Sequence, residues 1–322
     1  MNILITKDNN IKFLFKIYYF ILLLIVLSVL TSLIFTNNFY QKITIQNNVS
    51  LKITEQDSES YQINDLLTVK SLQDNKLIYN FHVDQIRETK IVPNIRVVNL
   101  PKDLKSIKSI ENRKELFIKI TLPLIVQENK KLALLNKKIK FIKNKFNRIS
   151  RDEAKFIKNL MEEYKEVTLD ALLIKVDEIP VSLALAQAVI ESGWGTSRFA
   201  YEGNALFGQY VWGQTTNGII PNERETDAIY KIKSFNSLGD SVASYMKNLN
   251  TNYHYNDFRI NRFVLRSNNL HLSGAYLAEY LFNYSIEQDY ITKVKNIIEM
   301  NNFEDFENLN IDQQLPLITD II

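Results

Sequence analysis

The chain has 322 residues, of which 46% are hydrophobic, and this is enough for one sizeable domain with appendages. Its formal net charge of +3 is close to neutral for this length, so overall charge gives no indication of a nucleic-acid partner. The sequence contains no cysteine, which excludes disulfides, a lipoprotein anchor and thiolate chemistry.

The first predicted element is a membrane span at residues 17–35, where nineteen residues are interrupted only by two serines and one threonine. A helix of this length crosses a hydrocarbon core of about 30 Å. Three lysines within residues 1–16 favour a cytoplasmic N-terminus, which places the rest of the chain on the periplasmic side of the inner membrane. A cleaved signal peptide is the alternative, but the first alanine is Ala133, so no Ala-x-Ala cleavage site follows the span. We therefore expect an uncleaved, single-pass signal anchor.

Residues 37–90 are polar and rich in Asn, Gln, Ile and Thr. Apolar residues alternate there with polar ones, which suggests short strands. The alternating positions are Ile43, Ile45, Val49, Leu51 and Ile53. We interpret this segment as an extracytoplasmic spacer or small β module and assign it no chemistry.

Residues 91–149 are predicted to be helical. Within them, residues 111–146 favour helices broken at Pro123, because proline lacks an amide donor. Apolar residues spaced three and four apart then predict one buried face. They are Leu132, Leu135, Ile139, Ile142 and Phe146.

The same region is basic, with thirteen Lys or Arg against three Glu between Lys105 and Arg148. Solvated helix faces explain such a run, and attraction to an anionic wall polymer or membrane surface is the functional alternative. Ser150 and Glu153 form a capping box that opens the next helix, with Phe156, Leu160 and Tyr164 facing inward. The two regions together predict a helical hairpin.

Two further helices are predicted at residues 169–176 and 180–192, and the composition then changes. All eight glycines, both tryptophans and ten of the sixteen tyrosines fall between Gly193 and Tyr290. Such a concentration is consistent with a sugar-binding cleft, and tyrosines of a half-buried core are the alternative. In residues 208–235, polar and β-prone residues alternate without helical periodicity, which predicts a small β-hairpin lobe.

Ser237 and Asp240 cap a following helix, and helices around Phe258, Leu277 and Ile297 complete the domain. The predicted fold class is α+β and predominantly helical. We place the catalytic domain at residues 150–302 and a C-terminal tail at 303–322.

The pentapeptide Glu191-Ser-Gly-Trp-Gly195 ends the apolar helix that begins near Pro180. Gly193 can take the left-handed conformation that ends a helix, so Glu191 is expected in the last turn. A carboxylate there is disfavoured by about 0.3–1 kcal/mol, because the terminal carbonyls are partly negative. Burial and this dipole both raise the pKa of a carboxyl group. Cleavage of a glycosidic bond requires such a protonated acid, although a solvated glutamate at a frayed helix end is the alternative.

Residues 186–200 together with Gly203-Asn204-Ala205-Leu206-Phe207-Gly208 resemble the motif of glycoside hydrolase family 73, and within it the Bax-type branch. The resemblance extends from about Val92 to Asn302. It includes the residues Arg113–Pro123, Glu128-Asn129, Asn248–Thr251, Tyr284-Ser285 and Tyr290. The resemblance implies a lysozyme-like fold and cleavage of the N-acetylglucosamine linkage in peptidoglycan glycan strands.

The resemblance also implies roles for individual residues. Glu191 is the general acid, and Tyr284 lies near it as a second catalytic residue. Glu223 or Glu225 is the candidate second carboxylate in the β lobe. Lys231 stands where the branch has a further glutamate, so assistance by the substrate's own acetamido group is the alternative. The substrate-binding candidates are Asn204, Phe207, Gly208, Trp212 and Tyr290.

No cofactor is implied, and His82, His254 and His271 have no metal-ligand spacing, so we predict no metal. The sequence thus predicts a membrane-anchored peptidoglycan endo-β-N-acetylglucosaminidase. Two alternatives are a lytic transglycosylase and an inactive wall-binding or division-associated scaffold. The sequence leaves protein partners, the oligomeric state and the stereochemical outcome open.

Overall fold

The computed structural model describes residues 68–70, 81–145, 148–213, 217–222 and 230–312, and the backbone of Ile318–Ile321. All of these belong to one compact unit, Asp65–Ile322. The predicted membrane span at 17–35 and the predicted strands between Ile43 and Ile53 lie outside the described residues. Within the described ranges, no helix is both long and apolar enough to cross a bilayer.

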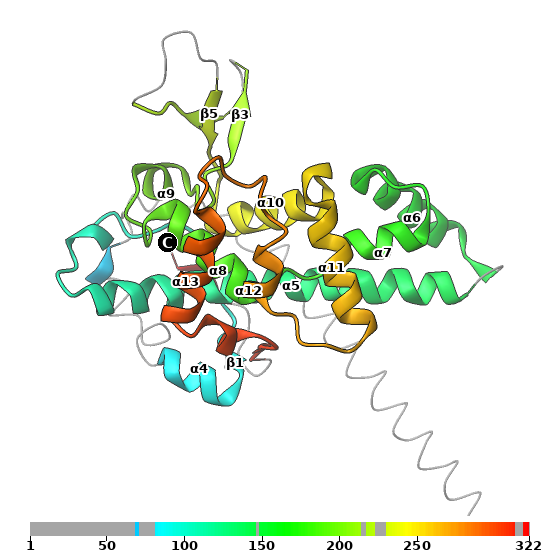
Figure 1. Ribbon diagram of the computed structural model, residues 1–322, viewed down its shortest axis with the longest axis horizontal. Coiled ribbons are helices and arrows are strands. Elements are labelled where there is room, and N and C mark those ends of the chain that lie inside the picture. Colours follow the sequence, from blue (N-terminus) through cyan, green and yellow to red (C-terminus); the bar gives the residue numbers. More distant parts are fainter. Residues whose placement is uncertain are drawn as a thin grey trace, which may run out of the picture. The chain divides into compact units, whose positions relative to one another are not determined.

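The described chain is mainly helical, as predicted, with short strands (Figure 1). Its α-helices are α4 (Val83–Thr89), α5 (Ile110–Asn144), α6 (Arg151–Tyr164), α7 (Leu169–Lys175), α8 (Val181–Ser192), α9 (Arg198–Gly203), α10 (Leu238–Thr251), α11 (Asn256–Ser267), α12 (Gly274–Ala278) and α13 (Tyr290–Met300). Its 3-10 helices are η1 (Leu104–Ser106), η3 (Tyr253–Tyr255) and η4 (Phe303–Phe306). Its strands are β1 (Ile91–Val92), β2 (Ile95–Val97), β3 (Tyr210–Trp212), β4 (Gly218–Ile219), β5 (Tyr230–Lys233), β6 (Asn310–Ile311) and β7 (Ile318–Ile321).

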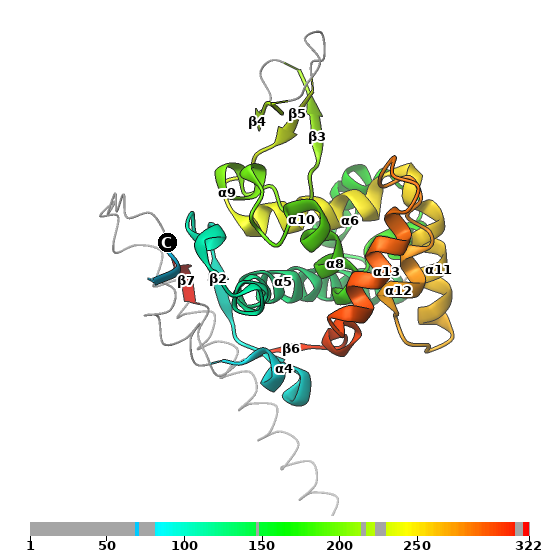
Figure 2. The same cartoon turned by 60° about the vertical axis from the view of Figure 1, so that its left-hand side comes forward.

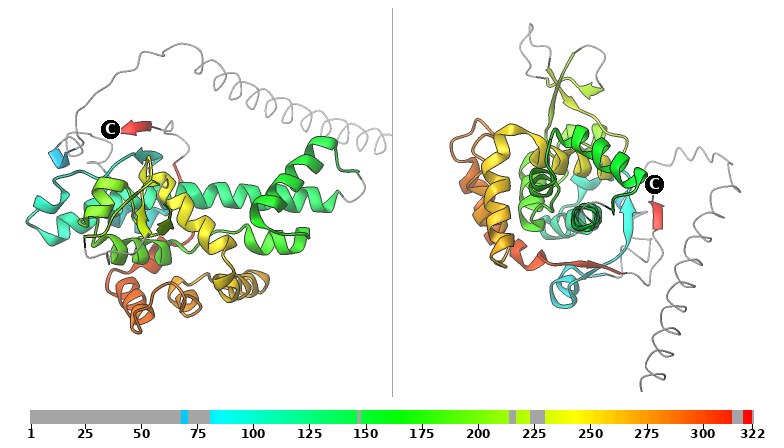
Figure 3. Two further views of the ribbon diagram at one scale, coloured as in Figure 1. Left: turned by 90° about the horizontal axis from the view of Figure 1, so that it is seen from above. Right: turned by 90° about the vertical axis from the view of Figure 1, so that its right-hand side faces the viewer.

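The long helix α5 runs unbroken through Pro123, so the predicted break at this residue is wrong. A proline inside a helix costs about 3 kcal/mol or more, because one hydrogen bond is lost and the ring crowds the preceding turn. Every residue from Leu116 to Gln127 is buried, and the apolar area removed from water there outweighs that cost. The right-hand view of Figure 3 looks along α5, with other helices arranged around it.

The second half of α5 forms the predicted hairpin with α6. Ser150 accepts the amide of Glu153 at 3.2 Å, and Glu153 accepts the amide of Ser150 at 2.9 Å, which confirms the capping box. Across the hairpin, the Lys138 ammonium lies 3.8 Å from the centre of the Phe156 ring. Ile157, Leu160 and Tyr164 supply the buried face of α6.

Helix α8 is the helix that positions the candidate site. It is apolar almost all round, which is the pattern of a helix enclosed by others. It packs against α5, α12, α13 and η4 (Figure 2). Its start at Val181 and its end at Ser192 agree with the prediction within one residue.

The predicted β lobe is a three-stranded antiparallel sheet with β5 between β3 and β4, rather than a simple hairpin. In its register Trp212 lies opposite Tyr230, and Tyr210 lies opposite Ile232. Figure 2 shows the lobe projecting beyond α9 and α10. Among the described residues, β4 of the lobe contacts α9.

The described parts of residues 303–322, a segment expected to form a tail, return to the start of the domain. Strand β6 pairs in parallel with β1, and β7 pairs in parallel with β2. Phe303 and Phe306 are fully buried. In the described part of residues 37–90, Val83–Thr89 is a helix, where a spacer or β module was expected.

Candidate active site

Glu191 lies in the last turn of α8, where the sequence predicts it. Gly193 caps the helix with φ 58° and ψ 48°, and the amide of Trp194 donates to the carbonyl of Val189 at 3.2 Å. Trp194 packs edge-on against Phe117 and Phe303, with ring centres 5.8 and 6.3 Å away. Trp194 therefore braces the helix end, and the chain turns away sharply after Glu191.

The Glu191 carboxyl group is largely enclosed and meets one tyrosine. The hydroxyl of Tyr290, at the start of α13, donates to Glu191 Oε1 at 3.0 Å. Burial raises the pKa of Glu191 to about 7, the Tyr290 hydrogen bond lowers it, and the negative charge of Glu287 raises it. A substantial fraction of Glu191 is therefore protonated at neutral pH.

A cluster of aromatic rings surrounds this pair. Tyr284 stacks on Tyr290 with ring centres 5.5 Å apart, and its own hydroxyl points to the carbonyl oxygen of Phe207 at 3.4 Å. Phe207 in turn stacks on Tyr245 at 3.9 Å. Burial raises the pKa of Tyr284 and of Tyr290 far above the ordinary tyrosine value, so both phenols stay neutral.

A buried hydrogen-bond chain leads to Glu191 from the opposite side of Tyr290. The Gln187 amide nitrogen donates to the Tyr290 hydroxyl at 3.0 Å, and the Tyr245 hydroxyl donates to Gln187 Oε1 at 2.6 Å. Gln187 and Tyr245 are both completely buried. Sequence analysis missed this chain. The sequence did contain one indication of Gln187. This residue is the polar interruption in the apolar run Leu183–Ile190, and it lies four residues before Glu191, on the same helix face.

The predicted substrate-binding residues occupy different environments. Asn204 is buried, with φ 52°, and its amide nitrogen donates to Asn99 and to the carbonyl of Phe235. Phe207 is 2% exposed. Gly208 lies against Glu191, because a Cβ added there would come within 2.9 Å of Glu191 Oε2. Trp212 is 65% exposed on the lobe.

Glu223 and Glu225, the predicted candidates for the second carboxylate, lie outside the described residues. Lys231 lies on β5, opposite Val211. Glu287, which sequence analysis did not single out, is exposed and forms an ion pair with Lys293 at 2.6 Å. Its place in the sequence could have indicated it, because Glu287 lies between Tyr284 and Tyr290, which were both predicted to belong to the site.

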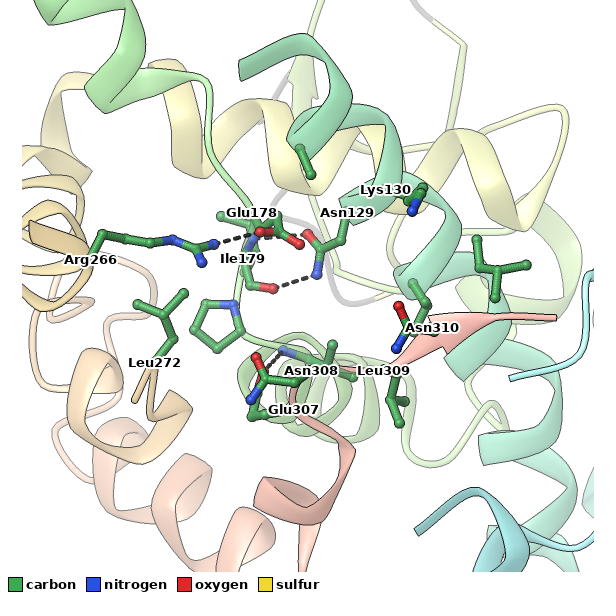
Figure 4. Close-up of a pocket in the computed structure, with 15 residues that line it drawn as sticks. Asn129, Lys130, Glu178, Ile179, Arg266, Leu272, Glu307, Asn308, Leu309 and Asn310 are labelled. Carbon is green, nitrogen blue, oxygen red and sulfur yellow. Dashed lines mark hydrogen bonds and ion pairs between the residues drawn. The ribbon is translucent and has the colours of Figure 1, made fainter. Parts of the chain in front are cut away.

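A separate cavity of about 170 Å³ lies at the other end of α8, roughly 15 Å along the helix from Glu191 (Figure 4). Arg266 reaches across it to Glu178 at 2.6 Å. Glu307 accepts the amides of Val181 and Ser182 there, at 3.1 and 2.9 Å. This carboxylate replaces the side-chain cap that Pro180 does not provide. Across the ranges that the structure describes, no three His, Cys, Asp or Glu side chains cluster as metal ligands.

Comparison with known proteins gives a family model, a sequence relative and a solved structure. A family model described as mannosyl-glycoprotein endo-beta-N-acetylglucosaminidase matches residues 170–303. Protein bax of Escherichia coli (strain K12) is 30% identical over 195 residues, which cover 57% of this chain and 67% of that protein. The catalytic domain of the autolysin Auto from Listeria monocytogenes is 14% identical, with a TM-score of 0.31, over 70% of this chain and 98% of that one.

The matched region contains α8 with Glu191, the β lobe and both late tyrosines. The identity to protein bax extends over two thirds of that relative. The chain therefore belongs to the glucosaminidase family of glycoside hydrolases.

Proposed function

We propose that this protein is a peptidoglycan endo-β-N-acetylglucosaminidase in which Glu191 is the general acid. The observation that carries the proposal is the Glu191–Tyr290 pair, a carboxyl group at the end of a buried helix that accepts a tyrosine hydroxyl at 3.0 Å. The family model supports the N-acetylglucosamine linkage as the bond that is cut. The predicted signal anchor supports a substrate outside the inner membrane, and peptidoglycan is the glycan found there.

In this mechanism, the protonated Glu191 carboxyl donates its proton to the glycosidic oxygen as the bond to the sugar breaks. A general acid works best when its pKa is close to the working pH. Burial raises the pKa of Glu191 to about 7, which meets this requirement. The exposed tryptophan Trp212 lies near Tyr210 on the lobe, with ring centres 6.3 Å apart, and we assign these rings to stacking on the sugar chain.

The second half of the reaction needs a base or nucleophile on the other side of the sugar ring. A carboxylate roughly 5–5.5 Å from the acid gives retention, and one about 6.5–9.5 Å away gives inversion. Glu223, Glu225 and Glu287 are the candidates, and the acetamido group of the substrate is the alternative. Replacing each glutamate by glutamine separates these routes. A loss of roughly a hundredfold or more at one position identifies the carboxylate, and three active variants indicate assistance by the substrate.

Digestion of purified sacculi by the full-length protein tests the reaction type. We expect new reducing ends on N-acetylglucosamine. Anhydro-muramic ends instead indicate a lytic transglycosylase. Binding to sacculi without any soluble product indicates a wall-binding scaffold.

We further propose that the protein is a single-pass protein of the inner membrane, with its catalytic domain in the periplasm. The hydrophobic residues 17–35 and the lysines before them support this topology. Protease added to spheroplasts should degrade the catalytic domain while the membrane stays intact. A catalytic domain that is protected until the cells are lysed contradicts the proposed orientation.

A further inference from the structure

We propose that Gln187 and Tyr245 are positioning residues that decide which oxygen of Glu191 carries the acidic proton. The inference rests on the proposed role of Glu191 as general acid. It concerns the direction of the hydrogen-bond chain that runs from Tyr245 through Gln187 and Tyr290 to Glu191.

Each donor in this chain points toward Glu191. The Tyr245 hydroxyl donates to Gln187 Oε1 at 2.6 Å, Gln187 Nε2 donates to the Tyr290 hydroxyl at 3.0 Å, and Tyr290 donates to Glu191 Oε1 at 3.0 Å. The chain links three helices, α10, α8 and α13. The ring of Tyr245 is held in place by stacking on Phe207.

The burial of Tyr245 fixes this direction. In the reverse direction the Gln187 amide is turned round, so its nitrogen donates to Tyr245 and its oxygen accepts from Tyr290. The Tyr245 proton then has no acceptor, because Gln187 Oε1 is the acceptor that the described residues offer it. Tyr245 is 0% exposed, so bulk solvent does not reach its hydroxyl. A buried donor without a partner is unfavourable, and the forward direction is therefore preferred.

The direction of the chain determines the position of the acidic proton. A tyrosine hydroxyl has one proton, and Tyr290 donates it to Oε1. Oε1 is thus an acceptor in both charge states, and the acid form of Glu191 carries its proton on Oε2. Oε2 lies beside Gly208, which has no side chain to cover it, and no described residue donates a hydrogen bond to it. The proton therefore faces the side from which we expect the glycosidic oxygen to approach.

The same chain stabilises the charge that develops in the reaction. When Oε2 passes its proton to the glycosidic oxygen, the electron pair of the breaking C–O bond stays with that oxygen, and Glu191 becomes a carboxylate. Hydrogen bonds to a charged group are stronger than those to a neutral group, so the Tyr290 bond strengthens as the proton leaves. An interaction that strengthens in this way accelerates the chemical step.

The effect of the hydrogen-bond chain on Glu191 can be measured in the pH profile of the activity, because few other groups that titrate face this carboxyl group in the part of the chain that the structure describes. They are Tyr290 on α13, Tyr284 and Glu287 ahead of that helix, Tyr245 on α10 and Tyr255 in η3. Burial raises the pKa of all four tyrosines above their ordinary value, so none of these phenols titrates near neutral pH. A change in the basic limb therefore reports on the Glu191 carboxyl group and its hydrogen bond.

The first test is Tyr245→Phe in the full-length protein, which removes the directing proton and keeps the ring on Phe207. Both chain directions then become available, and Glu191 can place its proton on Oε1, toward Tyr290. We expect kcat to fall about three- to tenfold, with KM within about twofold of wild type. The basic limb of kcat/KM should move to higher pH, because a bond donated by Glu191 favours its acid form. Tyr164→Phe is the control, since Tyr164 is also buried but lies on α6.

Gln187→Glu is the second variant. The introduced carboxylate accepts from Tyr245 and from Tyr290, so Tyr290 no longer donates to Glu191, and we expect kcat to fall more than about tenfold. Unchanged kcat and an unmoved basic limb in both folded variants overturn the inference. If they retain full activity while Glu191→Gln is inactive, only the positioning role fails. If Glu191→Gln is itself active, the proposed function fails.

Discussion

The carboxyl group of Glu191 and the hydroxyl of Tyr290 are separated by ninety-nine positions in the chain and lie 3.0 Å apart. Helix α8 brings one and helix α13 brings the other, and the two helices pack directly on each other. The pair joins a partly buried carboxyl group to a donor that stabilises its charged form. Opposing effects, burial against the hydrogen bond, therefore set the acidity of Glu191.

Replacing the acid tests the proposed role most directly. Glu191→Gln should lower kcat roughly a hundred- to ten-thousandfold, because a general acid contributes about that much. Release of soluble sugar from sacculi is the measurement. Glu299→Gln is the matched control, since Glu299 also lies near the end of a helix but is exposed. Equal activity of the two variants removes Glu191 from the mechanism.

The activity should depend on pH through the same group. Burial raises the pKa of Glu191 to about 7, so its acid form is present below that pH and is lost above it. The kcat/KM value should therefore fall as pH rises through about 7. Tyr290→Phe removes the bond that lowers this pKa, so the basic limb should move to higher pH, while kcat falls roughly tenfold. A basic limb that stays in place means that Tyr290 does not influence the acid.

Gly208 should not tolerate a side chain. It has φ 57°, which is unfavourable for other residues, and an added Cβ comes within 2.9 Å of Glu191 Oε2. We expect Gly208→Ala to lower kcat at least about tenfold and to reduce stability by about 1–2 kcal/mol. Gly239→Ala is the control, because the nearest atom to its added Cβ is 3.6 Å away. Kinetics and thermal unfolding of both variants give the comparison.

The exposed ring of Trp212 should contribute to substrate binding rather than to stability. Its side chain is 65% exposed on a short strand of the lobe. Trp212→Ala should raise KM on glycan chains by roughly two- to tenfold, since ring stacking contributes about 0.5–1.5 kcal/mol, and the Tm should change little. Phe141→Ala removes a ring on α5 that is 60% exposed, and it should leave KM unchanged. An effect of the same size in both variants contradicts a binding role.

The free energy of unfolding should decrease as the pH rises from about 5 to about 7. Burial raises the pKa of Glu307 to about 7, above the ordinary glutamate value, so the folded state binds a proton more tightly than the unfolded state. Stability is then lost as pH rises between these two values, by an amount on the order of 2 kcal/mol. Glu307→Gln should reduce the difference in Tm between pH 5 and pH 8. An identical pH dependence in the variant shows that other groups cause it.

Local sequence patterns predicted where several helices begin and end, because helix caps depend on residues that are close in the sequence. Ser150 and Glu153 form their capping box from residues three apart, and Gly193 ends α8 because it adopts φ 58° without strain. The position of Glu191 in the last turn follows from the same pattern. The predicted helix break at Pro123 is wrong, because tertiary burial around α5 outweighs the low helix propensity of proline.

The sequence by itself determined most of the helices, the β lobe and the position of Glu191 at the end of α8, since these depend on periodicity, caps and one compact motif. Only the tertiary structure decided what surrounds Glu191. Tyr290, Gln187 and Tyr245 meet through the packing of α13, α8 and α10, and Glu307 caps α8 from 125 residues away. No local rule relates such distant residues, because their contact depends on how whole helices pack to bury apolar surface.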